Sequence, residues 1–269
     1  MSLVPDSTPW SNTRVSRSPT LHIEPRGTAG QPPVVFLHGL LSSNLQWELH
    51  RSTFDPALQW FCAELWGHGG SPAPADPSAY SADGYVAELE AARRRLGVAR
   101  WVLVGQSLGA GLMIRYALAY PEAVRGIAMT NSMSAFSDVG AAARAPSLEE
   151  FRRLDLRAIP VHPIHAKRFP DELRQRMAEA GDRVDRESLW RAVTETTRST
   201  CCRDVVAKLA APALLVNGAR ERAFQPHRAF AAETIPAIEV RDLDAGHAVN
   251  VESPREFEAA LLKFVQRTH

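Results

Sequence analysis

The run GQSLG at residues 105–109 has the pattern Gly-x-Ser-x-Gly. The pattern alone is weak, since roughly one chain in ten of this length would contain it by chance. Its context is strong here, because a short apolar run at residues 101–104 precedes it and a mostly apolar stretch at 108–120 follows it. A serine on a sharp turn between a strand and a helix presents its hydroxyl at the sheet edge. Ser107 is therefore predicted to be a nucleophile, with a helix N-cap serine as the structural alternative.

A serine hydroxyl needs a base within hydrogen-bond reach and a group that orients this base. His247 is the best candidate for the base, because it follows the last predicted strand and precedes the final predicted helix. A loop at that point reaches the same sheet edge as Ser107. Among the other histidines, His38 and His68 lie in glycine turns and are predicted to be structural. Two more, His162 and His165, remain open as substrate contacts.

The acid that orients the base should fall between the serine and the histidine in this chain order. Glu221 lies just after the apolar run at residues 213–216, where its carboxylate would accept the N–H of His247 and select the imidazole tautomer. The alternative is a surface glutamate paired with Arg220 or Arg222. Other candidates for the acid are Asp244, Asp242 and Asp138.

Negative charge appears on the substrate oxygen when the serine attacks, and preorganised backbone N–H groups stabilise it. One donor is predicted to be the N–H of Leu108, directly after the serine. The second is predicted in the turn after His38 and Gly39, at the N–H of Leu40. Core packing of both leucine side chains is compatible with this role, because only their backbone is used.

Short apolar runs alternate with amphipathic stretches along the chain, which predicts an α/β protein with a parallel sheet covered by helices on both faces. The predicted strands are residues 14–16, 21–23, 34–37, 58–65, 101–104, 127–130, 213–216 and 238–240, and the predicted core helices are residues 43–50, 81–96, 108–120 and 254–267. The alternation stops between residues 134 and 204, where the helical stretches are 148–158, 171–180 and 185–198. We therefore expect a core of residues 1–133 and 205–269 with a helical insertion at 134–204.

Composition narrows the partners and the compartment. The formal net charge is +1, from 31 basic and 30 acidic residues, which does not favour nucleic acid or an anionic membrane. Three cysteines form no disulfide framework, and no metal-ligand spacing is present. The sequence shows no signal peptide and no apolar stretch of transmembrane length. We expect a cytoplasmic protein that takes a small-molecule substrate and no metal or cofactor; its oligomeric state is not predicted.

The sequence resembles the capped, serine-nucleophile branch of the α/β-hydrolase superfamily. The segments that carry the resemblance stand in the expected order: VVFLHG, GHGGSPAP, GQSLGA with YPEAVRGIAM, PALLVNG, and DAGHAVNVESPREFEAALLKF. The resemblance covers the chain from about residue 31 to the end, except the insertion, and implies a mostly parallel eight-stranded sheet with a helical cap inserted after the sixth strand. By position it implies nucleophile Ser107, base His247, acid Glu221 and oxyanion donors Leu40 and Leu108.

Two departures from the family pattern concern the site. Relatives usually carry aspartate where this chain has Glu221. They also often read D-x-R-G-H-G where this chain has ELWGHG at residues 64–69.

The leading hypothesis is a hydrolase of a small carboxylic ester or lactone that acts through an acyl-enzyme. The runner-up uses the same fold for carbon–carbon bond hydrolysis, elimination or cofactor-free oxygenation, and a third hypothesis is a non-catalytic small-molecule receptor. Arginines of the insertion that face Ser107 would indicate an anionic substrate, although solvent exposure is expected for each. The arginines concerned are Arg152, Arg153, Arg157 and Arg168.

Overall fold

A single sheet of seven strands forms the centre of the structure, a computed structural model that describes residues 19–137 and 146–269. The strand order is β1-β3-β2-β4-β5-β6-β7, and all neighbours are parallel except β1 and β3. The strands are β1 (Ile23–Gly27), β2 (Pro33–Leu37), β3 (Gln59–Ala63), β4 (Trp101–Gly105), β5 (Val124–Met129), β6 (Ala213–Gly218) and β7 (Glu239–Leu243).

The predicted α/β class with a mostly parallel sheet is confirmed, although the described residues form seven strands where eight were expected. The strand predicted at residues 14–16 lies outside the described residues. Each of the other seven predictions corresponds to one strand, with shifts at the ends. The largest shift is in β1, which was predicted at residues 21–23 and starts at Ile23, where its pairing with Ala63 of β3 begins.

Alternate side chains of the central strands enter two separate hydrophobic cores. In β2, Val35 and Leu37 belong to one core, whereas Val34 and Phe36 belong to the other. All four side chains are fully buried, as expected for a parallel strand that is covered on both faces. The sheet is therefore the middle layer of three.

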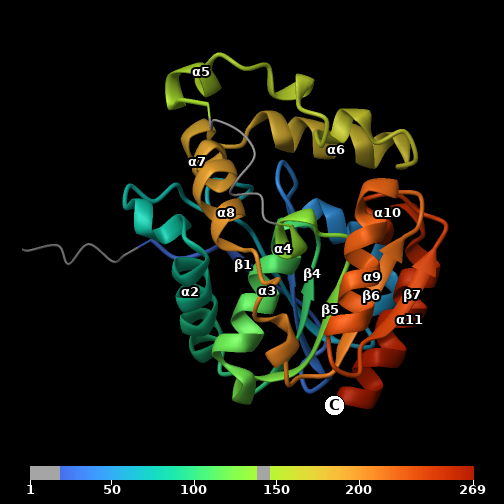
Figure 1. Ribbon diagram of the computed structural model, residues 1–269. Helices are drawn as coiled ribbons and strands as arrows, with labels where there is room; N and C mark the ends of the chain where they lie inside the picture. The colour runs from blue at the N-terminus through green and yellow to red at the C-terminus, as the bar shows by residue number, and fades with distance from the viewer. Residues whose placement is uncertain (1–18, 138–145) are drawn as a thin grey trace, which may run out of the picture.

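Helices on each face close these cores (Figure 1). One face is covered by α2 (Ala82–Arg95), α3 (Leu108–Ala119) and α9 (Gln225–Thr234), and the other by the 3₁₀ helix Asn44–His50, α1 (Arg51–Phe54) and α11 (Pro254–Thr268). The sequence did not predict α9, in which only Ala231 is fully buried. The stretch predicted at residues 43–50 is a 3₁₀ helix.

Helices and helical turns are the only regular secondary structure in the described part of the segment between β5 and β6. The segment contains α4 (Met133–Phe136), α5 (Leu148–Arg152), α6 (Asp171–Asp182), α7 (Arg186–Arg191), the π-helical turn Ala192–Thr196 and α8 (Thr197–Ser199). In Figure 1, α5 and α6 lie at the top, beyond the carboxyl ends of the strands. The stretch predicted as one helix at 148–158 is divided into α5 and the 3₁₀ turn Leu156–Ala158, because Asp155 starts a new N-cap.

The remaining elements are short. They are α10 (Val249–Glu252) and the 3₁₀ turns Pro77–Tyr80, Pro121–Ala123, Pro163–His165, Val206–Lys208 and Arg222–Phe224. Within the described ranges, every helix is too short or too polar to cross a lipid bilayer.

Candidate active site

Ser107 occupies the turn between β4 and α3 in a conformation that is unusual for a residue with a side chain. Its φ and ψ are 53° and −121°, a region that is sparsely populated except by glycine. The turn is held by hydrogen bonds from the N–H of Gly109 to the carbonyl of Gln106 (2.9 Å) and from the N–H of Ala110 to the carbonyl of Ser107 (3.0 Å). A Cβ at Gly109 would lie 2.3 Å from the carbonyl oxygen of Leu37, so only glycine permits this close packing of α3 on the sheet.

The turn after β2 lies directly against Ser107. A Cβ on Gly39 would be 2.8 Å from the Cβ of Ser107, so a larger residue would separate the two turns. The N–H groups of Leu40 and Leu108 donate no hydrogen bond to any residue that the structure describes. The N–H of Leu108 is free because the first turn of a helix has no internal acceptor for its donors. Two unpaired backbone donors therefore flank the serine.

Two buried histidines shape this second turn. The His68 Nε2 accepts the N–H of Leu41 (3.3 Å), and the His38 Nε2 accepts the N–H of Leu65 (3.3 Å). Each ring donates its Nδ1–H to a backbone carbonyl, at 2.9 Å from His68 and 2.7 Å from His38. Both imidazoles are therefore neutral, because a ring that accepts at Nε2 and donates at Nδ1 has one proton. They have the structural role that the sequence indicated.

The neutral histidine pair makes the stability of the fold depend on pH. Burial lowers the pKa of His38 from 6.5 to about 4, and burial together with the nearby His38 lowers that of His68 to about 3. Unfolding restores the higher pKa, so the unfolded chain takes up protons first as the pH falls, and the free energy of unfolding declines from pH 6.5 toward pH 4. We expect each histidine to lower the free energy of unfolding by about 1 kcal/mol between pH 6 and pH 5. Urea denaturation at both pH values measures this loss.

A comparison of variants isolates the contribution of the pair, because other histidines with lowered pKa values add to the total slope. The His68→Asn variant should lose about 1 kcal/mol less than the wild type between pH 6 and pH 5. The matched control is His22→Asn, which removes an exposed histidine and leaves the buried pair in place. An equal slope in His68→Asn and wild type would contradict the prediction.

The structure brings His247 and Glu221 together at the ends of the last two strands. The His247 Nδ1 lies 3.0 Å and 3.1 Å from the two carboxylate oxygens of Glu221. Burial by itself raises the pKa of Glu221, but the hydrogen bond and charge of His247 and a hydrogen bond from Asn131 outweigh it, so the net pKa is lowered. The carboxylate therefore stays ionised and holds the Nδ1–H tautomer, which leaves Nε2 free to accept a proton.

The alternative carboxylates are bound elsewhere. Asp244 pairs with Arg220, and Asp242 pairs with Arg228 at 2.6 Å. The pairing of Glu221 with Arg220 that the sequence left open is therefore wrong, because this arginine contacts Asp244 instead. The remaining alternative, Asp138, lies outside the described residues.

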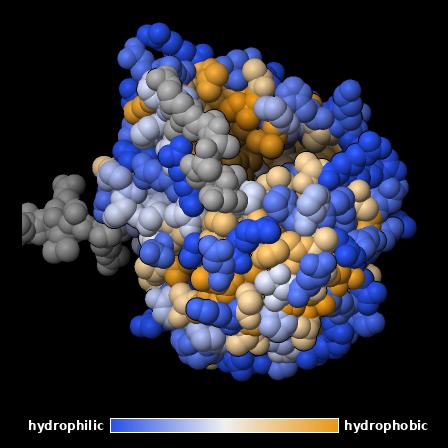
Figure 2. Space-filling view, viewed as in Figure 1, coloured by the Kyte–Doolittle hydropathy of each residue, from blue (hydrophilic) through white to orange (hydrophobic). Residues whose placement is uncertain are grey.

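One cavity of about 440 Å³ joins these groups. Its lining includes Ser107, Leu40, Leu108, Glu221 and His247, and Figure 2 shows an apolar hollow between the helices at the top and the body of the molecule. Within the described residues, no hydrogen bond joins the serine hydroxyl to the imidazole. Such bonds are often long in a site without substrate and tighten when substrate binds.

The lining also includes His162 and His165 from the segment between β5 and β6. His162 accepts the N–H of Ile164 at Nδ1 (3.2 Å), and His165 contacts the carbonyl of Arg157 through Nε2 (2.6 Å). Both histidines that the sequence left open as substrate contacts therefore border the cavity. The described residues contain no cluster of histidine, cysteine and acidic side chains that could hold a metal ion.

Sequence reasoning missed several polar residues around the site, among them Asn131, Glu252 and Gln106. Asn131 donates to Glu221 Oε2 (2.7 Å) and accepts the N–H of Gly218 (2.9 Å), so it links β5 to the carboxylate. Glu252 lines the cavity and accepts the N–H of Gly246 (2.8 Å), next to His247. Gln106 also lines the cavity, at 4% exposure. The position of Asn131 directly after a predicted strand was the one available signal.

The family model described as alpha/beta hydrolase fold matches residues 32–254. A 2-succinyl-6-hydroxy-2,4-cyclohexadiene-1-carboxylate synthase of Serratia proteamaculans is 26% identical over 255 residues, which cover 89% of this chain and 95% of that protein. A protein of Klebsiella pneumoniae named as a candidate carbamate hydrolase is 33% identical over 117 residues, 44% of each chain.

Among solved structures, the enol-lactonase of Burkholderia xenovorans LB400 superposes with a TM-score of 0.74 at 20% identity, over 91% of this chain and 96% of that chain. A thermophilic esterase of Thermogutta terrifontis gives a TM-score of 0.79 at 20% identity, over 93% and 94%. At these identities the superpositions establish the fold alone.

Proposed function

Since the chain belongs to the alpha/beta hydrolase fold family and is an enzyme of that family, we propose that it hydrolyses a small carboxylic ester or lactone through a covalent intermediate on Ser107. The observation that carries the proposal is the meeting of three features at one cavity. These are a serine on a strained turn, a histidine hydrogen-bonded to an ionised glutamate, and two backbone N–H groups without acceptors. Together they are the parts that acyl transfer requires.

In the first half of the reaction, the Ser107 hydroxyl attacks the carbonyl carbon while its proton moves to Nε2 of His247. The carbonyl electrons move onto the oxygen, and the N–H groups of Leu40 and Leu108 stabilise the resulting oxyanion. Glu221 stabilises the imidazolium through Nδ1–H. The tetrahedral intermediate then collapses, the ester C–O bond breaks, and His247 returns the proton to the departing alkoxide.

In the second half, water attacks the acyl-enzyme and gives one proton to His247. The new tetrahedral intermediate expels the Ser107 oxygen, which takes the proton back, and the carboxylic acid leaves. A lactone would leave as a single hydroxy acid, because its alcohol stays attached to the acyl group. No metal or cofactor takes part in these steps.

Residues 134–204 act in this proposal as a cap over the cavity, inserted into the core of residues 1–133 and 205–269. Support comes from the lining, to which the cap contributes mainly apolar side chains. Among them are Val161, Ala166, Phe169 and Met177. An apolar cover excludes bulk water from the acylation step and strengthens the hydrogen bonds to the oxyanion.

The runner-up hypothesis is a non-ester reaction on the same fold, such as carbon–carbon bond hydrolysis or elimination. It has support from the Serratia relative, whose name denotes synthesis of a carboxylate-bearing product. Hydrolysis of an ester or lactone agrees better with the cavity, since none of Arg152, Arg153, Arg157 and Arg168 is in its lining. The names esterase and enol-lactonase of the two solved structures are consistent with the same choice.

Covalent labelling tests the proposal directly. A fluorophosphonate should react with the protein in a ratio of one to one, abolish the hydrolysis of p-nitrophenyl butyrate, and leave its phosphonyl mass on the peptide that contains Ser107. Multiple turnovers of the ester before labelling would exclude a receptor that binds without catalysis. Full activity of the labelled protein, or a label on another residue, would refute the proposed nucleophile.

A further inference from the structure

No lysine or arginine is in the lining of the cavity among the residues that the structure describes. The acidic side chains of the lining are Glu221 and Glu252, and the remaining groups are histidines, uncharged polar residues and apolar residues. Residues 138–145 lie outside the described ranges. The described lining therefore offers no lysine or arginine to a negatively charged substrate.

Arg168 is absent from the cavity lining and forms an ion pair with a carboxylate that lines it. The Arg168 Nε lies 3.4 Å from Glu252 Oε2, and its Nη2 donates to the carbonyl of Asp244 (3.0 Å). The Glu252 side chain is 10% exposed, whereas that of Arg168 is 40% exposed. The carboxylate is thus the inner member of the pair, and it both lines the cavity and neutralises the guanidinium on its outer side.

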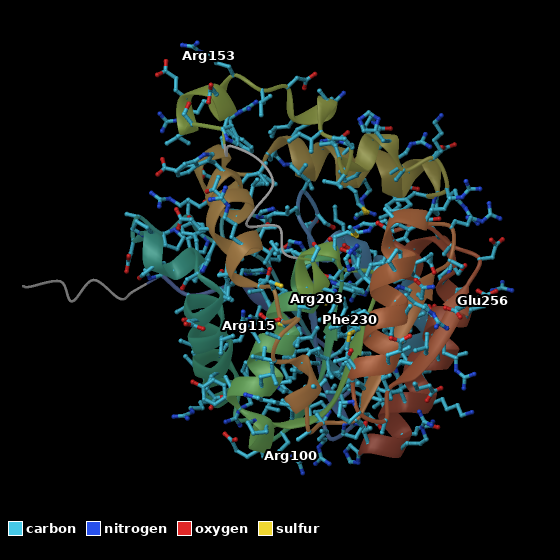
Figure 3. The ribbon with its side chains drawn as sticks, viewed as in Figure 1. Arg100, Arg115, Arg153, Arg203, Phe230 and Glu256 are labelled. Atoms are coloured by element: carbon cyan, nitrogen blue, oxygen red, sulfur yellow. The ribbon has the colours of Figure 1, made fainter. Side chains whose placement is uncertain are left out.

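Three further arginines between residues 134 and 204 also have acidic partners, and one of these pairs is Arg153 with Glu149 (2.6 Å). Arg152 pairs with Glu187 (3.3 Å), and Arg157 pairs with Asp182 (2.6 Å). Arg153 projects outward at the top of the molecule (Figure 3). These four arginines are paired with carboxylates, and no lysine or arginine from the described part of residues 134–204 is in the cavity lining.

We propose that the site accepts uncharged acyl groups and excludes those that carry a carboxylate, and that Glu252 sets much of this preference. The inference rests on the proposed hydrolase function. A carboxylate that enters an apolar lining loses its hydration and finds no cation in return, which is costly. The nearby Glu252 adds Coulomb repulsion that is stronger in a dry cavity than in water.

Two esters of matched shape test the proposal with the wild-type enzyme. In p-nitrophenyl 4-methylpentanoate an isopropyl group occupies the place of the carboxylate in mono-p-nitrophenyl succinate. We expect kcat/KM to be at least about tenfold higher for the uncharged ester. Equal values, or a preference for the succinate, would overturn the inference.

The Ser107→Ala variant separates this failure from a failure of the proposed function. It also measures the background hydrolysis rate of the succinate ester, because the carboxylate of this ester can cleave the ester bond without the enzyme. If wild type hydrolyses both esters equally and Ser107→Ala hydrolyses neither, only the inference on charge is wrong. If Ser107→Ala retains the activity on the uncharged ester, the proposed nucleophile is wrong.

Two variants assign the preference to the Glu252–Arg168 pair. Glu252→Gln keeps an acceptor for the N–H of Gly246, removes the inner charge and frees Arg168, so the preference for the uncharged ester should fall about tenfold. Arg168→Gln leaves Glu252 unneutralised, so the preference should rise. A preference that stays the same in both variants would overturn the role of Glu252.

The matched control is Glu256→Gln, which changes the net charge of the protein equally. Glu256 lies in the first turn of α11, is exposed at the right edge of the view (Figure 3) and is absent from the cavity lining. Its variant should keep the wild-type ratio of the two esters. A shift in this control equal to that in Glu252→Gln would assign the effect to net charge and overturn the local explanation.

Discussion

Replacement of Ser107 by alanine is expected to lower kcat/KM for p-nitrophenyl butyrate by about 10⁴-fold or more. The loss is large because the covalent intermediate cannot form, while the backbone donors and the cavity can still bind the ester. Alanine has the same backbone restrictions as serine at φ 53°, so the folded structure should be retained. Steady-state kinetics measure the loss. The variant is purified with a fresh column and vessel so that no wild-type enzyme contaminates it, and circular dichroism checks that it is folded.

A second substitution at the same position separates strain from chemistry. Ser107→Gly should be as inactive as Ser107→Ala but more stable than wild type by about 1 kcal/mol, because glycine adopts this backbone conformation freely. Activity within tenfold of wild type in either variant would show that another group is the nucleophile. An unchanged stability in Ser107→Gly would show that the turn stores no strain.

Replacement of Glu221 by glutamine is expected to lower kcat by about 10³-fold to 10⁴-fold, with little change in KM. Glutamine keeps the shape of the side chain but removes the charge that stabilises the imidazolium. Its amide can also donate to Nδ1 of His247 and select the wrong tautomer. Initial rates with p-nitrophenyl butyrate at saturating substrate measure the effect.

The two neighbouring aspartates are the matched controls for Glu221. Asp242→Asn and Asp244→Asn should each change kcat by less than about threefold, because both carboxylates pair with surface arginines and lie outside the His247 contact. Asn131→Ala should have an intermediate effect of about tenfold, since it removes one hydrogen bond to Glu221 but leaves the charge. A severe loss in Asp244→Asn together with an active Glu221→Gln would reverse the assignment of the acid.

The parts of the site that the sequence identified are those specified by local patterns. The GQSLG run lies between a buried strand and a buried helix, and this setting requires glycines at 105 and 109 because the two elements pack closely there. Alternation of apolar runs with helical stretches likewise predicted the parallel sheet, since each pattern reports which faces are buried. His247 followed from its place after the last strand of such a sheet.

Side chains that act through tertiary contacts could not be read in the same way. A helical insertion was expected, but the sequence did not reveal that Arg168 pairs with Glu252 and that Glu252 lines the cavity. Asn131 and Glu221 are 90 residues apart and meet only because β5 and β6 are neighbours in the sheet. Neither contact can be predicted from the local sequence.

The sequence by itself determined the fold class, the serine turn and the position of the histidine loop, because hydrophobic period and glycine placement are local properties of the chain. Only the tertiary structure decided between Glu221, Asp242 and Asp244 as the partner of His247. Three carboxylates near one loop are equivalent in the sequence, and the choice depends on which of them the folded chain brings within hydrogen-bond distance of the imidazole. In the folded chain Arg228 and Arg220 bind the two aspartates, and Glu221 remains for the imidazole.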